Sequence, residues 1–210
     1  MSIQKSVRLT PRDNAILQFI TEFGYCTIHH IRRKFVLTIY RAYQVMQRLI
    51  KAELVLHQRI FHAESGIYML TKKGADGTGL RPLPRIPLAS YHHHLKVIDL
   101  YLTLSEKHPD MHWISERRLR QERYAKWVGK RGHVADAIIE FPESKKIVIE
   151  VELSLKSQAR LSDILKGYKA DFSITEVWYY CPLNVFERLN PFKATMSQLK
   201  LYSLDEVIKS

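Results

Sequence analysis

Three acidic residues in two neighbouring β-type segments, Asp136, Glu150 and Glu152, have the types and spacing for metal chemistry. The segments HVADAIIEF and KKIVIEVEL are strongly apolar, which predicts two central strands of a buried sheet. Acids on central strands are unfavourable unless something neutralises them. A divalent cation, Mg²⁺ or Mn²⁺, is one compensator, because hard oxygen ligands suit it and its bound water can attack phosphorus. The alternatives are solvated carboxylates or a salt-bridge cluster with Lys156 and Arg160.

The short turn PES between these segments predicts a hairpin centred on Glu143. Residues at equal distances from this centre face one another across the two strands. Two of the resulting pairs are favourable and the third sets like charges opposite each other, which again calls for a compensating charge. The pairs are Glu140 with Lys146, Ile138 with Val148, and Asp136 with Glu150.

The spacing from Asp136 to the EVE triplet that begins at Glu150 resembles the PD-(D/E)XK nuclease core, a four-stranded sheet flanked by helices. The resemblance implies that Asp136 and Glu150 ligate the metal ion. It gives Glu152 the role of general base or second-metal ligand, and it lets Lys156 supply a missing positive charge. Two features depart from the family pattern: Ala135 stands where proline often precedes the aspartate, and Glu152 stands in place of the usual lysine.

The whole chain is similar to the plasmid replication-relaxation family, including MobC-type relaxases. The similarity rests on domain order and on the segments HHLKVIDLYLTL, WISERRLR, HVADAIIEF and IVIEVELSLKSQARLSDILKGY. It implies a sequence-directed, metal-dependent DNA nickase or endonuclease acting on plasmid or other mobile DNA, with relaxosome or mobilization proteins as partners. A non-catalytic transcriptional or replication regulator with a degenerate nuclease fold, and a relaxosome accessory protein, are the alternatives.

Two further side chains near the acids could take part in chemistry. His133 precedes Asp136 by three positions, so strand alternation turns it to the opposite face unless a bulge intervenes. It is either a core or surface histidine or a proton shuttle. Tyr168 continues the apolar stripe of a predicted helix over residues 154–169, which favours packing; a covalent nucleophile is its alternative role.

The first 75 residues predict a winged helix-turn-helix. Helices begin at the N-caps Thr10, Thr27 and Thr38, and the short strands LVLHQRI and GIYMLT follow. This order resembles the winged helix-turn-helix, in which the third helix enters the major groove and the wing touches phosphates. The expected DNA contacts are Tyr40, Arg41, Gln44, Gln47, Arg48 and Lys51 on the third helix, with Lys72 and Lys73 after the hairpin.

A second basic segment lies in the other half of the chain, between Arg117 and Arg131. Its cations are interleaved with Tyr124 and Trp127, a pattern that suits single-stranded or distorted DNA. A mobile solvated loop is the alternative. The expected contacts here are Arg117, Arg118, Arg120 and Arg123.

Domain organisation follows from composition. Residues 76–90 are rich in glycine and proline and predict a linker, which leaves an α/β domain over residues 91–210, a mixed sheet flanked by helices in a chain that is α+β overall. Adjacent histidines at 92–94 lack zinc-ligand spacing. Cys26 and Cys181 lie inside apolar segments and predict buried thiols in a reducing compartment.

The net charge of +12 favours a polyanionic partner, above all DNA. Residues 1–90 hold 14 Lys and Arg against 5 Asp and Glu, whereas residues 91–210 hold 19 against 16. The absence of a long apolar run or a leader-like N-terminus predicts a cytoplasmic protein without membrane contact. The sequence leaves the oligomeric state open, with a homodimer as one alternative.

Overall fold

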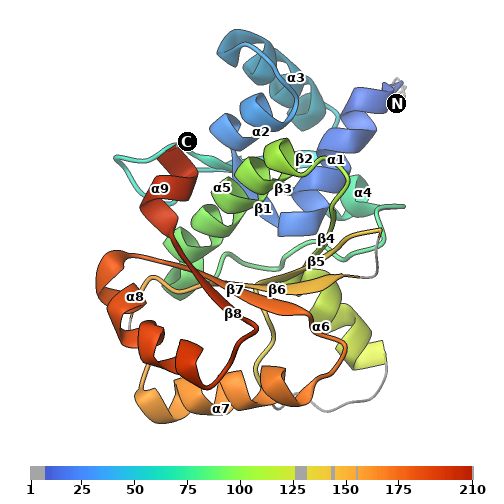
Figure 1. The fold of residues 1–210 in the computed structure, drawn as a ribbon. Helices are drawn as coiled ribbons and strands as arrows, with labels where there is room; N and C mark the ends of the chain where they lie inside the picture. The colour runs from blue at the N-terminus through green and yellow to red at the C-terminus, as the bar shows by residue number, and fades with distance from the viewer. Residues whose placement is uncertain (1–7, 126–131, 143–144, 155, 210) are drawn as a thin grey trace, which may run out of the picture. The chain divides into compact units, whose positions relative to one another are not determined.

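A computed structural model describes residues 8–125, 132–142, 145–154 and 156–209 (Figure 1). It contains two compact units, Met1–Pro87 and Leu88–Ser210. The division falls within the segment 76–90 that composition predicts to be a linker. The last three residues of that segment form a short 3-10 helix, Leu88–Ser90.

The N-terminal unit is a winged helix-turn-helix. Its three main helices carry a three-stranded antiparallel sheet with the strand order β1-β3-β2. The wing hairpin is formed by the last two strands. The elements are α1 (Pro11–Phe23), β1 (Tyr25–Thr27), α2 (Ile28–Lys34), α3 (Ile39–Lys51), β2 (Val55–Gln58), β3 (Ile67–Leu70) and α4 (Lys72–Ala75).

Side-chain caps place the helix starts where the sequence predicts them. The Thr10 hydroxyl accepts a hydrogen bond from the Asp13 amide at 3.2 Å, and Thr38 does the same for the Arg41 amide at 3.2 Å. Thr27 caps α2 in the same way. Strand β1 was not predicted from the sequence, because its three residues are all buried and show no alternation of apolar and polar side chains.

The turn between α2 and α3 contains a strained residue. Val36 has φ = 50°, a left-handed conformation that a β-branched side chain adopts at a cost of about 1–3 kcal/mol. Its side chain is 92% exposed, so packing does not offset that strain. The backbone of this turn is therefore held by the two helices that it joins.

We expect Val36→Gly to stabilise the N-terminal unit by roughly 0.5–1 kcal/mol, because the relief of strain exceeds the added flexibility of the unfolded chain. Hydrogen exchange of α2 and α3, measured by mass spectrometry, reports the change. Val36→Ala is the control; it keeps Cβ and should give a smaller gain. A glycine variant less stable than the parent would contradict the strain.

The C-terminal unit is a five-stranded sheet with the order β4-β5-β6-β7-β8. The first three strands are antiparallel and the last two join in parallel. Figure 1 shows α7 and α8 on one face of the sheet and α5 on the other. The elements are α5 (Tyr91–Lys107), β4 (His112–Ser115), α6 (Glu116–Ala125), β5 (Ala137–Glu140), β6 (Lys146–Val151), α7 (Gln158–Ala170), β7 (Glu176–Cys181), α8 (Leu183–Leu189), a 3-10 helix η2 (Asn190–Ala194), β8 (Leu199–Ser203) and α9 (Leu204–Lys209).

The hairpin register of β5 and β6 is the one predicted from the turn. Glu140 pairs with Lys146, and Ile138 pairs with Val148. Asp136 precedes β5, so it has no ladder partner in β6. The alternation of side chains along β5 therefore does not extend back to Asp136. Strand geometry does not determine the direction of the Asp136 side chain.

Candidate nucleic-acid interface and carboxylate cluster

The exposed face of α3 carries long polar side chains on the winged-helix unit. Tyr40 is 70% exposed, and Arg41 donates from Nη1 to Oε1 of Gln44 at 3.1 Å. Gln47 and Lys51 are also exposed. The opposite face packs into the core through Ala42, Val45, Met46 and Leu49. The predicted helical amphipathicity is thus observed, with five of the six expected contact residues on the solvent side.

Arg48 is the exception. Its guanidinium forms an ion pair with the carboxylate of Asp13, whose side chain is 0% exposed. Burial alone would raise the pKa of Asp13, but the hydrogen bonds from Arg48 and Thr10 outweigh it and lower that pKa. Arg48 therefore joins α3 to α1, a structural role that amphipathic spacing does not reveal.

The two lysines after the wing also differ from each other. Lys72 is exposed at the start of α4. Lys73 donates from Nζ to the Ala52 carbonyl at 2.9 Å and lies 3.7 Å from the Glu53 carboxylate. Cations at a helix C-terminus satisfy its free carbonyls, so Lys73 caps the end of α3.

The basic segment of the second unit begins as a helix, α6, rather than as a solvated loop. Arg120 pairs with Glu116 one turn away, and Arg123 donates to the Gly132 carbonyl at 3.1 Å. Arg117 and Arg118 are half-buried. The remaining cations of the segment and Trp127 lie outside the described residues.

Asp136 is held by the backbone and by a histidine from a distant helix. Its Oδ2 accepts the Val151 amide at 2.8 Å and lies 3.2 Å from Nε2 of His93. The same His93 nitrogen lies 2.9 Å from the Val151 carbonyl. Burial lowers the pKa of His93, but the hydrogen bond and charge of Asp136 raise it by more. His93 comes from α5, and its sequence neighbourhood carries no signal for this pairing.

Glu150 is 1% exposed and has two side-chain partners among the described residues. His133 lies with Nε2 2.6 Å from Oε1 of Glu150, and the Tyr168 hydroxyl donates to the same oxygen. Parity predicts that His133 faces away, and this was wrong: His133 lies outside β5, after Gly132 at φ = 113°. Tyr168 packs against the core as expected and adds a hydrogen bond.

Burial dominates the electrostatics of this cluster. It raises the pKa of Glu150; the His133 hydrogen bond opposes the shift and the Asp136 charge adds to it. Burial beside Glu150 also raises the pKa of Tyr168 far above its usual value. A phenol that holds its proton this strongly donates a hydrogen bond and is a poor nucleophile, which argues against the covalent role considered for Tyr168.

Glu152 is buried and forms an ion pair with Lys156, four positions further along the chain. The three carboxylates predicted to share a cation are thus hydrogen-bonded or ion-paired to protein groups. The expected Mg²⁺ or Mn²⁺ site was wrong: among the described residues, no group of three or more His, Cys, Asp or Glu is arranged to hold a metal ion. Of the two alternatives, the salt-bridge cluster is closer, with Lys156 in it as predicted and with histidine and tyrosine as further partners.

No family model and no curated protein sequence matches the chain. Solved structures do: Lactococcus lactis ZitR in complex with DNA matches with 20% identity over 61% of this chain and 76% of that chain, at a TM-score of 0.32. A structure titled as a zinc-responsive MarR family member, also L. lactis ZitR, matches with 18% identity over 61% and 79%, at 0.32. The adhesin competence repressor AdcR of Streptococcus pyogenes matches with 16% identity over 58% and 79%, at 0.31.

These matches correct the similarity to the plasmid replication-relaxation family, because they are to proteins titled as a repressor and as a DNA-bound MarR family member. The expected nickase or endonuclease activity was wrong on the same finding. The contacts of Asp136, Glu150 and Glu152 with protein side chains agree with this correction of the expected activity. No helix of the described residues is long and apolar enough to cross a membrane.

Proposed function

We propose that this chain is a non-catalytic DNA-binding regulator of transcription or replication. The observation that carries the proposal is the exposed face of α3, which presents Tyr40, Arg41, Gln44, Gln47 and Lys51 on a winged helix-turn-helix. Between Ile39 and Ala52 the sequence has no Asp or Glu. A helix with this face suits the major groove, where arginine and glutamine read base edges and lysine pairs with phosphate.

Charge supports the same surface. Residues 1–90 carry most of the net positive charge of the chain, and neutralisation of phosphates with release of counterions is the main source of affinity for DNA. The Arg48 guanidinium is ion-paired with the Asp13 carboxylate. In our proposal, Arg41 and Lys51 therefore supply the cationic contacts of α3, and Lys72 adds one beyond the wing.

The C-terminal unit enters this proposal as a non-catalytic module. We infer a degenerate form of a nuclease-like core, which keeps a mixed sheet flanked by helices. Its buried carboxylates Glu150 and Glu152 are hydrogen-bonded or ion-paired to protein side chains. Such a unit can serve assembly or ligand sensing while the winged helix selects the DNA.

The test is duplex binding by the full chain, measured by fluorescence anisotropy on a labelled duplex enriched from a random-sequence library. We expect Arg41→Ala to weaken binding about tenfold and to make the salt slope shallower by about 1 if the lost contact is to phosphate. The reason is that Arg41 is exposed at the start of α3, and among the described residues its guanidinium hydrogen-bonds to the neighbouring Gln44 alone.

Arg160→Ala is the matched control, because it removes the same exposed charge from α7 in the other unit. Its affinity should stay within about twofold of the parent. Equal loss in both variants would attribute binding to overall charge. Failure of the parent chain to bind any duplex would reject the proposed function itself.

A further inference from the structure

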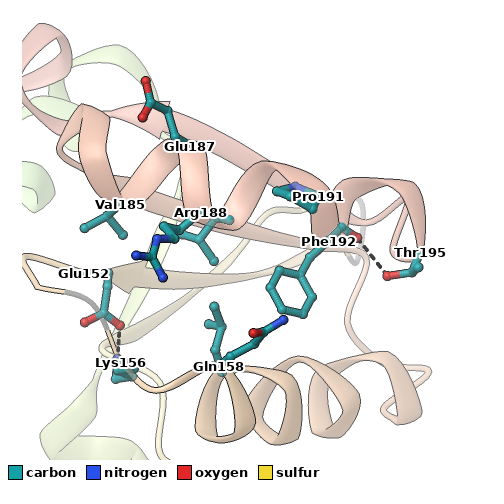
Figure 2. A pocket seen from close by; sticks show the side chains of 11 residues that line it. Glu152, Lys156, Gln158, Val185, Glu187, Arg188, Pro191, Phe192 and Thr195 are labelled. Atoms are coloured by element: carbon teal, nitrogen blue, oxygen red, sulfur yellow. Dashed lines mark hydrogen bonds and ion pairs between the residues drawn. The ribbon is translucent and has the colours of Figure 1, made fainter.

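The C-terminal unit contains a cavity of about 470 Å³ between α7 and the α8–η2 segment (Figure 2). Pockets for small molecules commonly measure about 300–1,000 Å³. Its walls are largely apolar, formed by Leu161, Val185, Leu189 and Phe192. The cavity therefore has the size and lining for the apolar body of a small ligand.

Polar contacts hold the two walls of the cavity, α7 and the α8–η2 segment, at a defined separation. Lys169 of α7 donates from Nζ to the Thr195 carbonyl at 2.9 Å, which ties α7 to the end of η2. The Thr195 hydroxyl donates to the Phe192 carbonyl at 3.0 Å, as Figure 2 shows. Phe192 is thereby positioned by its backbone, and the cavity is preformed, which lowers the entropic cost of binding.

The charged side chains of the lining, two carboxylates, one ammonium and one guanidinium, sum to zero. Glu152 and Lys156 neutralise each other at one end of the cavity. Figure 2 shows Arg188 directed toward that end, whereas Glu187 is directed away from it. No hydrogen bond or ion pair joins the Arg188 guanidinium to another side chain in the described part of the unit, and the same holds for the Gln158 amide.

We propose that this cavity binds a small monocarboxylate with an apolar body, such as an aryl-substituted or medium-chain acid. A guanidinium matches a carboxylate in a two-point hydrogen bond, and Gln158 offers a further donor. Arg188 provides the one guanidinium among the described residues that line the cavity, and one guanidinium pairs with one carboxylate, which favours a monoanion over a dianion. The apolar end of the ligand lies against Phe192 and Leu161. This inference concerns the second unit alone and does not depend on the DNA-binding role of the first.

Isothermal titration calorimetry of the full chain tests the proposal with two probes of equal shape, 4-phenylbutyrate and 4-phenylbutan-1-ol. We expect saturable binding of the carboxylate at one site, about tenfold tighter than binding of the alcohol, because a charge-assisted hydrogen bond is stronger than a neutral one. Arg188→Gln should bring the carboxylate to the affinity of the alcohol and leave the alcohol unchanged. Phe192→Ala should weaken both probes alike.

Lys193→Gln is the control, since Lys193 is an exposed cation of η2 outside the cavity lining. It should bind both probes as the parent does. Denaturation followed by tryptophan fluorescence checks that each variant is folded. The proposal is overturned if neither probe binds, if the two bind equally, or if Arg188→Gln and Lys193→Gln lose carboxylate affinity to the same extent.

Discussion

His133→Leu is expected to lower the free energy of unfolding of the C-terminal unit by about 2–3 kcal/mol at neutral pH. Both His133 and Tyr168 hydrogen-bond the Glu150 carboxylate, and Glu150 is 1% exposed. A buried carboxylate that loses a donor keeps its desolvation penalty, which is why removing one partner is costly. Urea denaturation followed by tryptophan fluorescence measures the effect, because all three tryptophans lie beyond residue 88.

The loss should depend on pH in one direction. Burial holds the pKa of folded Glu150 above its ordinary value, and removal of His133 raises it further. A glutamate with a raised pKa stabilises the folded state below the unfolded pKa of about 4.3 and loses that contribution as pH rises through the folded pKa. The difference between variant and parent should therefore be largest above the folded pKa and shrink toward pH 4.

His112→Leu is the matched control. His112 also lies beside a glutamate, 3.7 Å from Glu140, but these side chains are 72% and 44% exposed. An exposed ion pair contributes about 0–1 kcal/mol, so this variant should behave like the parent. Equal losses in the two variants, or a His133→Leu loss that grows as pH falls, would contradict the buried Glu150 network.

Arg48→Met is expected to destabilise the N-terminal unit by about 2–3 kcal/mol, again through a buried acid left without its partner. Asp13 is fully buried and its carboxylate accepts from Arg48 and from Thr10. The pKa of Asp13 is lowered, because these bonds outweigh the effect of burial. The stabilisation is therefore complete above the unfolded pKa of about 3.9 and is lost as pH falls through the folded value.

Hydrogen exchange of α1, measured by mass spectrometry at two pH values, reports this loss within the N-terminal unit. Arg41→Met is the control on the same helix, since Arg41 is exposed and its guanidinium hydrogen-bonds to Gln44 alone in the described part of the chain. It should leave exchange unchanged. If Arg48→Met keeps full protection and weakens DNA binding instead, Arg48 is the DNA contact that its position on α3 predicts.

Local signals of the sequence predicted local features of the fold. Threonine caps place the starts of three helices because each cap involves residues only three positions apart. The β5–β6 register follows from a short turn. The same short-range logic brought Asp136, Glu150 and Glu152 into one neighbourhood. It also led to the wrong neutralising group, because acidic residues close together in the sequence suggested a metal ion.

The neutralising groups come from elsewhere in the chain. His93 reaches Asp136 across 43 positions, and Arg48 reaches Asp13 across 35. Periodicity describes which face a residue occupies on its own element, and it is silent about which partner another element brings to that face. A metal site and a salt-bridged cluster therefore look alike until the packing of helices on the sheet is known.

The sequence by itself determined the three helices and the wing hairpin of the winged helix-turn-helix, the basic face of α3 and the alternation of helices and strands beyond residue 90, because each depends on contacts within a few residues. Only the tertiary structure decided that Arg48 pairs with Asp13 and that histidine, tyrosine and lysine hold the acids in and just after β6. It also decided that Arg188 lines a cavity, with no side-chain partner among the described residues. The physical reason is that desolvation makes a buried charge depend on whatever distant group folding places beside it.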